Sequence, residues 1–364
     1  MTGPPSLWIR GEDRASERRA PVVPADAGRL VEAGYQVTVE DSAQRCFPIE
    51  AYAAAGCLIV AAGSWPAAPT EAFVIGLKEL PDLPWSLEHR HIYFGHAYKA
   101  QSGSDRLLQR FVEGGGSLLD LEYLVDDDGR RLAAFGYWAG YLGAALAVLQ
   151  YRGALTGPLA VLERSVLDAQ LRQGAGGAAP SVLVVGALGR SGHGARDALA
   201  MAGIAATGWD VAETSNLDRG AVIKHDLLIN AVLVDHQIPP FLTAAEVADA
   251  GRLLSVICDI SCDVRSPFNV LPIYQQLTCW QRPVTRLCAM PPLDLIAIDN
   301  LPALLPVAAS TAFSADLTPQ LVGLAAEQGG WRNCARAFER ATQSLASQSL
   351  ATQTLGTDGE VSDD

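Results

Sequence analysis

Lysine is scarce in this sequence, and two of its lysines stand where they could take part in proton transfer. Lys78, Lys99 and Lys224 are the only lysines among 27 basic residues. A lysine can lose its proton near neutral pH in a suitable environment, which arginine cannot do. Lys78 ends one strand-like apolar run, and His96 follows the next, with Lys99 shortly after it. Lys78 and His96 could therefore act as two acid–base groups.

Each of these residues also has a plainer interpretation. A lysine at a strand end is often simply solvated, and a single histidine is more often a structural hydrogen-bond donor. The combination favours chemistry, because ligands of open α/β sheets bind outside the carboxyl ends of the strands, where both residues are expected. Glu79 and Glu122 stand at neighbouring sites, and their carboxylates could tune the pKa of the two bases.

The first 130 residues alternate between strand-like and helix-like segments. Strands are expected at 7–10, 36–39, 58–61, 73–78, 91–95 and 117–121, and helices at 26–33, 49–55 and 104–113. Such alternation is typical of a parallel sheet with helices on both faces. The acidic run at 126–129 is interpreted as a solvated turn.

A glycine-rich turn follows the apolar strand expected at 182–185. Its residues Gly186, Gly189 and Gly192 have a G-x-x-G-x-x-G spacing, and the helix expected at 195–201 comes next. Glycines let the backbone approach a pyrophosphate, and the N–H groups at a helix N-terminus attract its charge. The segment from Ser181 to Asp210 is therefore predicted to bind a dinucleotide, although a tight turn without a ligand is the alternative.

Asp210 indicates which dinucleotide is bound. It ends the second strand of this unit, roughly 20 residues beyond the glycines, where an acidic residue accepts hydrogen bonds from the ribose diol. A carboxylate there repels a 2′-phosphate, so NAD is favoured over NADP.

Composition narrows the class of protein. The chain has 364 residues, enough for about two domains. Its net charge of −13 makes nucleic acid and membrane surfaces poor partners. The seven cysteines form no C-x-x-C pair, and no targeting segment is recognised, so a cytoplasmic protein with reduced thiols is expected. No metal site is expected, because the histidines lack paired ligand spacing.

One uncharged stretch, 132–149, is nearly long enough to span a membrane. Its glycines and alanines favour a buried helix that packs closely against other protein, here one between two domains, although a membrane span stays an alternative.

Several motifs resemble those of the NAD-dependent, lysine-forming saccharopine dehydrogenases, which are related to alanine dehydrogenase and nicotinamide transhydrogenase. The matching segments are Phe94-Gly95-His96-Ala97-Tyr98-Lys99-Ala100-Gln101, Ile75-Gly76-Leu77-Lys78-Glu79, Asp120-Leu121-Glu122-Tyr123, 129–136, Gly186-Ala187-Leu188-Gly189-Arg190, Asp259-Ile260-Ser261 and 298–302. They occur in family order from about Ile9 to Phe338. The resemblance implies that saccharopine, NAD and water give L-lysine, 2-oxoglutarate and NADH.

The resemblance also implies residue roles. Lys78 would accept the proton of the secondary amine, and His96 would activate the water that attacks the imine, while Glu79 and Glu122 set the pKa of Lys78. The substrate would be bound by Arg19, Lys99, Gln101, Arg131 and Phe135. The cofactor would be bound by Gly186, Leu188, Gly189, Arg190, Gly192, Asp210, Asp259, Ser261 and Asp299.

Two alternatives stay open. Loops at 102–105, 234–237 and 288–292 depart from the family pattern, so the protein could be an opine-type dehydrogenase or imine reductase that joins a different amine to a keto acid. A non-catalytic NAD-sensing protein is the alternative of another class. Its catalytic positions would be degraded, whereas Lys78 and His96 are intact.

The expected architecture is α/β, with two Rossmann-like domains whose parallel sheets are separated by a cleft. Residues 1–135 and 306–350 would form a discontinuous substrate-binding and catalytic domain. Residues 136–305 would form the NAD-binding domain, and 351–364 a flexible acidic tail. The protein is expected to be a monomer or a small homo-oligomer whose partners are small-molecule substrates.

Overall fold

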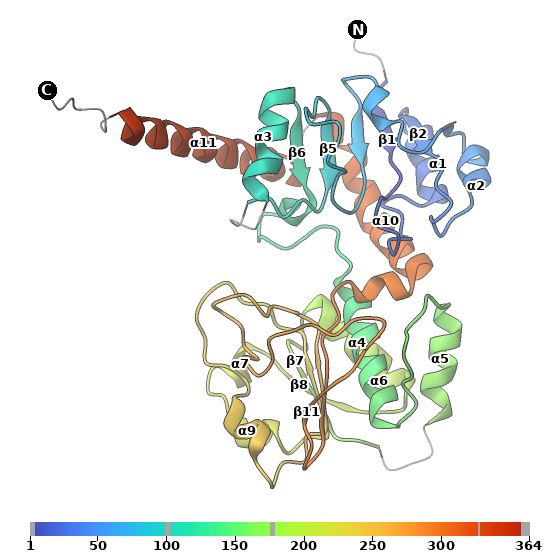
Figure 1. The fold of residues 1–364 in the computed structure, drawn as a ribbon. Helices are drawn as coiled ribbons and strands as arrows, with labels where there is room; N and C mark the ends of the chain where they lie inside the picture. The colour runs from blue at the N-terminus through green and yellow to red at the C-terminus, as the bar shows by residue number, and fades with distance from the viewer. Residues whose placement is uncertain (1–3, 99–102, 175–178, 327, 358–364) are drawn as a thin grey trace, which may run out of the picture. The chain divides into compact units, whose positions relative to one another are not determined.

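The chain folds into two compact α/β units. A computed structural model describes residues 4–98, 103–174, 179–326 and 328–357, with only the backbone of 348–357. One unit comprises residues 1–134 and 310–364, and the other comprises 135–309. Figure 1 shows a sheet with flanking helices in each unit.

The sheet of the first unit consists of six parallel strands. Their order is β3-β2-β1-β4-β5-β6, so the order reverses between β1 and β4. In doubly wound sheets this reversal creates a crevice at the carboxyl ends of the two strands. The strands are β1 (Ser6–Ile9), β2 (Gln36–Glu40), β3 (Leu58–Val60), β4 (Phe73–Ile75), β5 (Arg90–Tyr93) and β6 (Ser117–Asp120).

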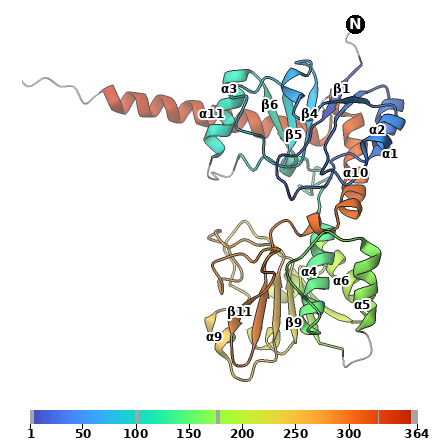
Figure 2. The same cartoon turned by 45° about the vertical axis from the view of Figure 1, so that its right-hand side comes forward.

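Helices from both ends of the chain cover this first sheet. The long C-terminal helix, α11 (Gly330–Thr357), packs on β6 and on α3 (Ser104–Gly114). Its distal part projects from the unit in both views (Figures 1 and 2). The helices are α1 (Pro24–Glu32), α2 (Ile49–Ala54), α3 (Ser104–Gly114), α10 (Pro306–Val322) and α11 (Gly330–Thr357), with short 3-10 turns η1 (Trp65–Ala67), η2 (Leu121–Tyr123) and η4 (Leu324–Ala326).

The second sheet has the order β11-β12-β10-β9-β7-β8, in which only the edge strand β11 is antiparallel to its neighbour. Along β7, Val182 and Val184 join the core on one face, whereas Leu183 and Val185 join the core on the other. The uninterrupted apolar run of this strand follows from burial on both faces. The strands are β7 (Val182–Val185), β8 (Ala206–Trp209), β9 (Leu227–Asn230), β10 (Val256–Asp259), β11 (Thr285–Cys288) and β12 (Leu293–Ile296).

Close helix packing forms one face of the second unit. The glycine-rich helix α4 (Gly136–Tyr151) packs against α6 (Arg190–Met201) on the same side of the sheet as α5 (Arg164–Gln173), and α9 (Ala244–Ala248) lies on the other side (Figure 2). The remaining helical turns are α7 (Val211–Thr214), α8 (Arg219–Val222) and η3 (Leu301–Leu304). None of the helices in the described ranges has both the length and the apolarity that a membrane crossing requires.

The α/β class is confirmed, but several expected boundaries were wrong. The strands expected at 73–78 and 91–95 end at Ile75 and Tyr93, so Lys78 and His96 lie in the loops beyond them. Helix α6 begins at Arg190 rather than at 195, directly after the glycine turn. Helix α11 continues through 351–357 of the segment expected as a tail, and 358–364 lie outside the described residues.

The packing of α4 on α6 gives the first testable expectation. A Cβ at Gly140 would overlap the backbone carbonyl of Ser191. Gly140→Ala should therefore lower the free energy of unfolding by about 3 kcal/mol, because backbone cannot move aside as a side chain does. Denaturant unfolding measures this difference.

Gly28→Ala is the matched control within α1. A Cβ there would meet Ala55 at an ordinary 3.5 Å. Alanine also favours the helix, so this variant should be neutral or more stable. Equal changes in the free energy of unfolding of the two variants would contradict the proposed role of the close contact between α4 and α6.

Candidate active site and dinucleotide site

The topological reversal of the first unit places Lys78 just beyond the carboxyl end of β4. The backbone of this loop is held by an ion pair, in which Arg10 Nη1 lies 3.5 Å from Glu12 Oε2. Glu12 accepts hydrogen bonds from the backbone N–H groups of Leu77 (2.6 Å) and Lys78 (3.0 Å). Arg10 Nη2 donates to the carbonyl of Lys78. Hydrogen bonds thus hold both the backbone N–H and the backbone carbonyl of Lys78, the candidate base.

Arg10 and Glu12 were not predicted as site residues. Burial raises the pKa of the Glu12 carboxyl, and the charge of Arg10 opposes that rise. Gly76 makes room for this pair, because a Cβ there would lie 2.5 Å from the guanidinium carbon of Arg10. The position of Arg10 at the carboxyl end of the strand expected at 7–10 was the sequence signal that could have identified it.

Two carboxylates interact with the charge of Lys78. Glu17 forms a buried two-bond pair with Arg19, with distances of 2.8 and 2.6 Å. The pKa of Glu17 is lowered, because these bonds and the charges of Arg19 and Lys78 outweigh its desolvation. The pKa of Glu79 is also lowered, through its pair with Arg14 at 2.7 Å and through Lys78. Glu17 was missed in the sequence, although it stands two residues before Arg19.

His96 lies in the loop after β5, the strand next to β4 in the sheet. Its side chain is exposed, and its backbone is left-handed, with φ of +49°. On the next strand end, Glu122 forms an ion pair with Arg131 at 3.1 Å. The strand pairing thus brings Lys78 and His96 to neighbouring strand ends. Lys99 and Gln101, expected to bind substrate, lie outside the described residues.

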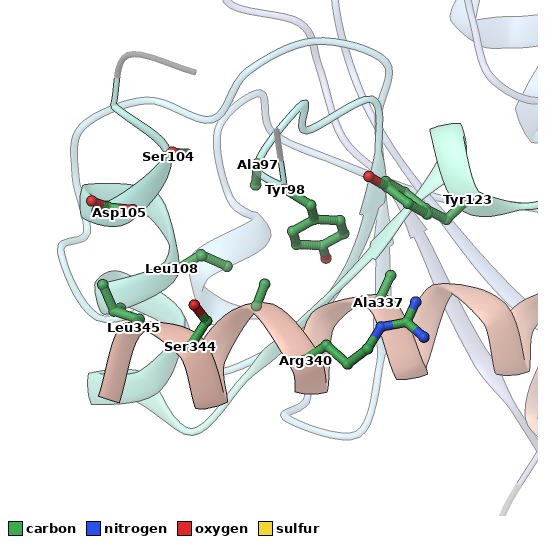
Figure 3. A pocket seen from close by; sticks show the side chains of 11 residues that line it. Ala97, Tyr98, Ser104, Asp105, Leu108, Tyr123, Ala337, Arg340, Ser344 and Leu345 are labelled. Atoms are coloured by element: carbon green, nitrogen blue, oxygen red, sulfur yellow. The ribbon is translucent and has the colours of Figure 1, made fainter. Parts of the chain in front are cut away.

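A cavity of about 370 Å³ lies beside the loop that carries His96 (Figure 3). Tyr98, Tyr123 and Arg340 of α11 are among the residues that line it. The Tyr98 hydroxyl donates to the carbonyl of Leu118 at 3.0 Å, which fastens the loop to β6.

The glycine turn of the second unit has the shape of a phosphate cradle. Gly186 is left-handed, with φ of +83°, and α6 begins four residues later. A Cβ at Gly192 would overlap the carbonyl of Gly186, so only glycine lets the helix start this close to the strand. A helix N-terminus directly after a glycine turn is an arrangement that can bind a pyrophosphate.

Asp210 lies directly after β8, beside this cradle. Its carboxylate accepts hydrogen bonds from the backbone N–H groups of Leu188 and Val211, both at 3.0 Å. The carboxylate is therefore held in place, and Asp210 is half-buried. Its role in binding a ribose diol stays a prediction.

Three further residues expected at the cofactor gather around Cys262. Asp259 and Asp299 both raise the pKa of the Cys262 thiol, although burial is the largest cause. Asp259 is fully buried, and it accepts hydrogen bonds from Ser261 Oγ (2.6 Å), Asn230 (3.0 Å) and Tyr274 (2.7 Å). Ser261 and Asp259 therefore act as one hydrogen-bonded group.

The other expected residues are placed individually. Phe135 precedes α4 and packs against the core of the second unit. Leu188 is exposed in the glycine turn, Gly189 caps α6, and Arg190 is its first residue. In the described part of the chain, no group of three or more histidine, cysteine, aspartate or glutamate residues could hold a metal ion.

The fold defines the broad class of this protein. Residues 8–142 match the family model of the alanine dehydrogenase/PNT N-terminal domain. The structure resembles L-alanine dehydrogenase with a TM-score of 0.66 and 17% identity, over 94% of this chain and 99% of the other. It also resembles a transhydrogenase from Sinorhizobium meliloti, with a TM-score of 0.63 and 16% identity, over 88% and 94%. The chain thus has the fold of the alanine dehydrogenase class.

Sequence similarity identifies the family within that class. The chain is 39% identical to saccharopine dehydrogenase [NAD(+), L-lysine-forming] of Emericella nidulans, over 94% of this chain and 99% of the relative. It is also 39% identical to the Neurospora crassa protein of the same name, over 94% and 98%. The chain belongs to the family of NAD-dependent, L-lysine-forming saccharopine dehydrogenases.

The buried pair of Glu17 and Arg19 predicts a pH-dependent contribution to stability. The folded-state pKa of Glu17 lies below its ordinary value of 4.5. Its contribution is therefore complete above that value and is lost as the pH falls through the folded-state pKa. Glu17→Gln should lower the free energy of unfolding by about 3 kcal/mol at pH 7, because it removes the anion from a buried pair.

Urea unfolding of the variant and the parent protein, at pH 7 and at successively lower pH, measures this. The difference should shrink as the pH falls through the titration of Glu17. Glu163→Gln, at an exposed glutamate, is the control and should change little at either pH. A Glu17→Gln difference that does not depend on pH would contradict the expectation.

Proposed function

We propose that the protein catalyses the NAD-dependent oxidative deamination of saccharopine to L-lysine and 2-oxoglutarate, and its reversal by reductive condensation. The observation that carries the proposal is the placement of Lys78 and His96 beyond the ends of paired strands β4 and β5, in a chain aligned with saccharopine dehydrogenases over nearly its full length. The seven cysteines form no disulfide, which fits a reducing compartment such as the cytoplasm.

The residues of the first unit supply the proton transfers. Lys78 accepts the proton of the substrate's secondary amine, which prepares the carbon–nitrogen bond for oxidation to an imine. His96 then removes a proton from the water that attacks the imine carbon, and a proton is returned to the nitrogen as the carbinolamine collapses. The negative charges of Glu79 and Glu122 adjust the basicity of Lys78, and the charge of Glu17 adds to their effect.

Cationic and polar side chains bind the substrate in this proposal. Arg19, Arg131, Lys99 and Gln101 bind its carboxylates, since guanidinium groups can do so with two parallel hydrogen bonds. Phe135 packs against its carbon chain.

The second unit holds the dinucleotide, which supplies the oxidant of the reaction. The residues fit this group, because the glycine turn leaves the N-terminus of α6 open to a pyrophosphate. Asp210 accepts hydrogen bonds from the ribose diol and disfavours a 2′-phosphate, so the cofactor is NAD rather than NADP. Asp259, Ser261 and Asp299 line the nicotinamide end.

Substrate choice is tested with the purified protein, NADH, 2-oxoglutarate and a panel of amines. L-lysine should give the fastest loss of NADH absorbance, and NADPH should support the reaction roughly tenfold less well or worse. A faster reaction with another amine would establish an opine-type dehydrogenase or imine reductase instead. No turnover with any pair of amine and keto acid would leave a non-catalytic NAD-binding protein.

The role of Lys78 is tested by Lys78→Met. Saccharopine turnover should fall by about 100-fold or more, because loss of a general base removes that much of the rate. NAD affinity, measured by calorimetry, should change little, because the residue lies in the other unit. Lys224→Met is the matched control, since Lys224 is exposed in the second unit, and it should turn over normally. Normal turnover by Lys78→Met would contradict its assignment as the base.

A further inference from the structure

Asp120, the last residue of β6, has a buried carboxylate of which only one oxygen accepts a hydrogen bond from the part of the chain that the structure describes. Asp120 has no exposed surface, and it pairs in register with Tyr93, the last residue of β5. One carboxylate oxygen, Oδ1, accepts a hydrogen bond from the backbone N–H of Glu122 at 3.0 Å. The other, Oδ2, has no hydrogen-bond partner among the described residues.

Such a group is costly for the fold. Burying an ionised carboxylate without full compensation destabilises a protein by several kcal/mol in order of magnitude. Desolvation accordingly raises the pKa of the Asp120 carboxyl. An asparagine would keep the bond to Glu122 without the charge. The charge itself therefore has no structural explanation in this part of the molecule.

The uncompensated oxygen lies against the loop that carries His96. A Cβ at Gly95 would be 3.4 Å from Asp120 Oδ2 and 2.6 Å from a methyl group of Leu118. Glycine at this position thus lets the loop approach β6. The Gly95 N–H interacts favourably with the carboxylate, although Oδ2 gains no bond of hydrogen-bond geometry. His96 follows immediately in its left-handed conformation.

The groups that surround Asp120 come from four elements. Tyr93 is on β5, and His96 and Tyr98 are in the loop after it. The remaining groups are Glu122 and Tyr123 of η2 and Cys334 of α11. Among the described residues of this set, only His96 can become positive, and its charge favours the ionised carboxylate.

We propose that Asp120 is a positioning residue for His96, whose buried carboxylate holds the histidine loop and stabilises the imidazolium that forms when His96 takes a proton from water. This inference rests on the proposed function. In this step the water oxygen bonds to the imine carbon, an O–H bond of the water breaks as its proton moves to the imidazole, and the electron pair of the C=N π bond passes to the nitrogen. Asp120 touches no reacting atom and acts only through His96.

The test compares Asp120→Asn with the parent protein in saccharopine oxidation. The value of kcat/KM should fall about tenfold at neutral pH. The acid limb of its pH profile should move to lower pH, because a nearby negative charge is lost. The melting temperature should stay the same or rise, and NAD affinity should not change. Asp218→Asn is the control, since Asp218 also caps a helical turn, accepting from Ala221 N at 3.1 Å, and it should change nothing.

A double-mutant cycle separates positioning from support of the fold. In a His96→Gln background, Asp120→Asn should reduce turnover by less than about twofold, because its effect passes through the missing histidine. The inference is overturned by an equal loss in both backgrounds, by an unshifted pH profile, or by a variant that melts earlier or does not fold. If the parent protein fails to oxidise saccharopine, both the proposed function and this inference are overturned. If the parent protein is active, the variants test the role of Asp120 separately from the proposed function.

Discussion

The parallel pairing of β4 between β1 and β5 is the constraint on which the candidate active site depends. Register fixes Ile75 beside Ile9 on one side and beside Ile92 on the other. Each strand therefore ends at the same edge, and the loops that leave it carry Lys78 and His96. Neither residue has a regular backbone to hold it, so the loops need other supports.

Those supports are buried charges. Arg10 and Glu12 hold the backbone of Lys78, and the pair of Glu17 with Arg19 adds to its field. Asp120 lies beneath the His96 loop in the same way. A buried ion pair adds little stability compared with apolar residues of similar volume, although breaking it is costly, so the concentration of such charges at one sheet edge supports the proposed acid–base chemistry there.

In the second unit, the glycine turn would let the backbone come close to the pyrophosphate of a dinucleotide. The glycines of its turn remove the side chains that would block the start of α6, and α4 reaches α6 through glycines as well. Asp210 adds a negative charge beside this turn. In the proposed function, shape supplies phosphate binding, whereas this charge selects among dinucleotides.

The sequence by itself determined the α/β class, the family, the glycine turn and the two candidate bases. These depend on local spacing, since strands, turns and motifs are encoded within a few residues of one another. Only the tertiary structure decided what surrounds the bases. Arg10 reaches Lys78 across 68 positions of sequence, and Asp120 meets the His96 loop through strand pairing. Such contacts arise from sheet order and register, which the local pattern of residues does not specify.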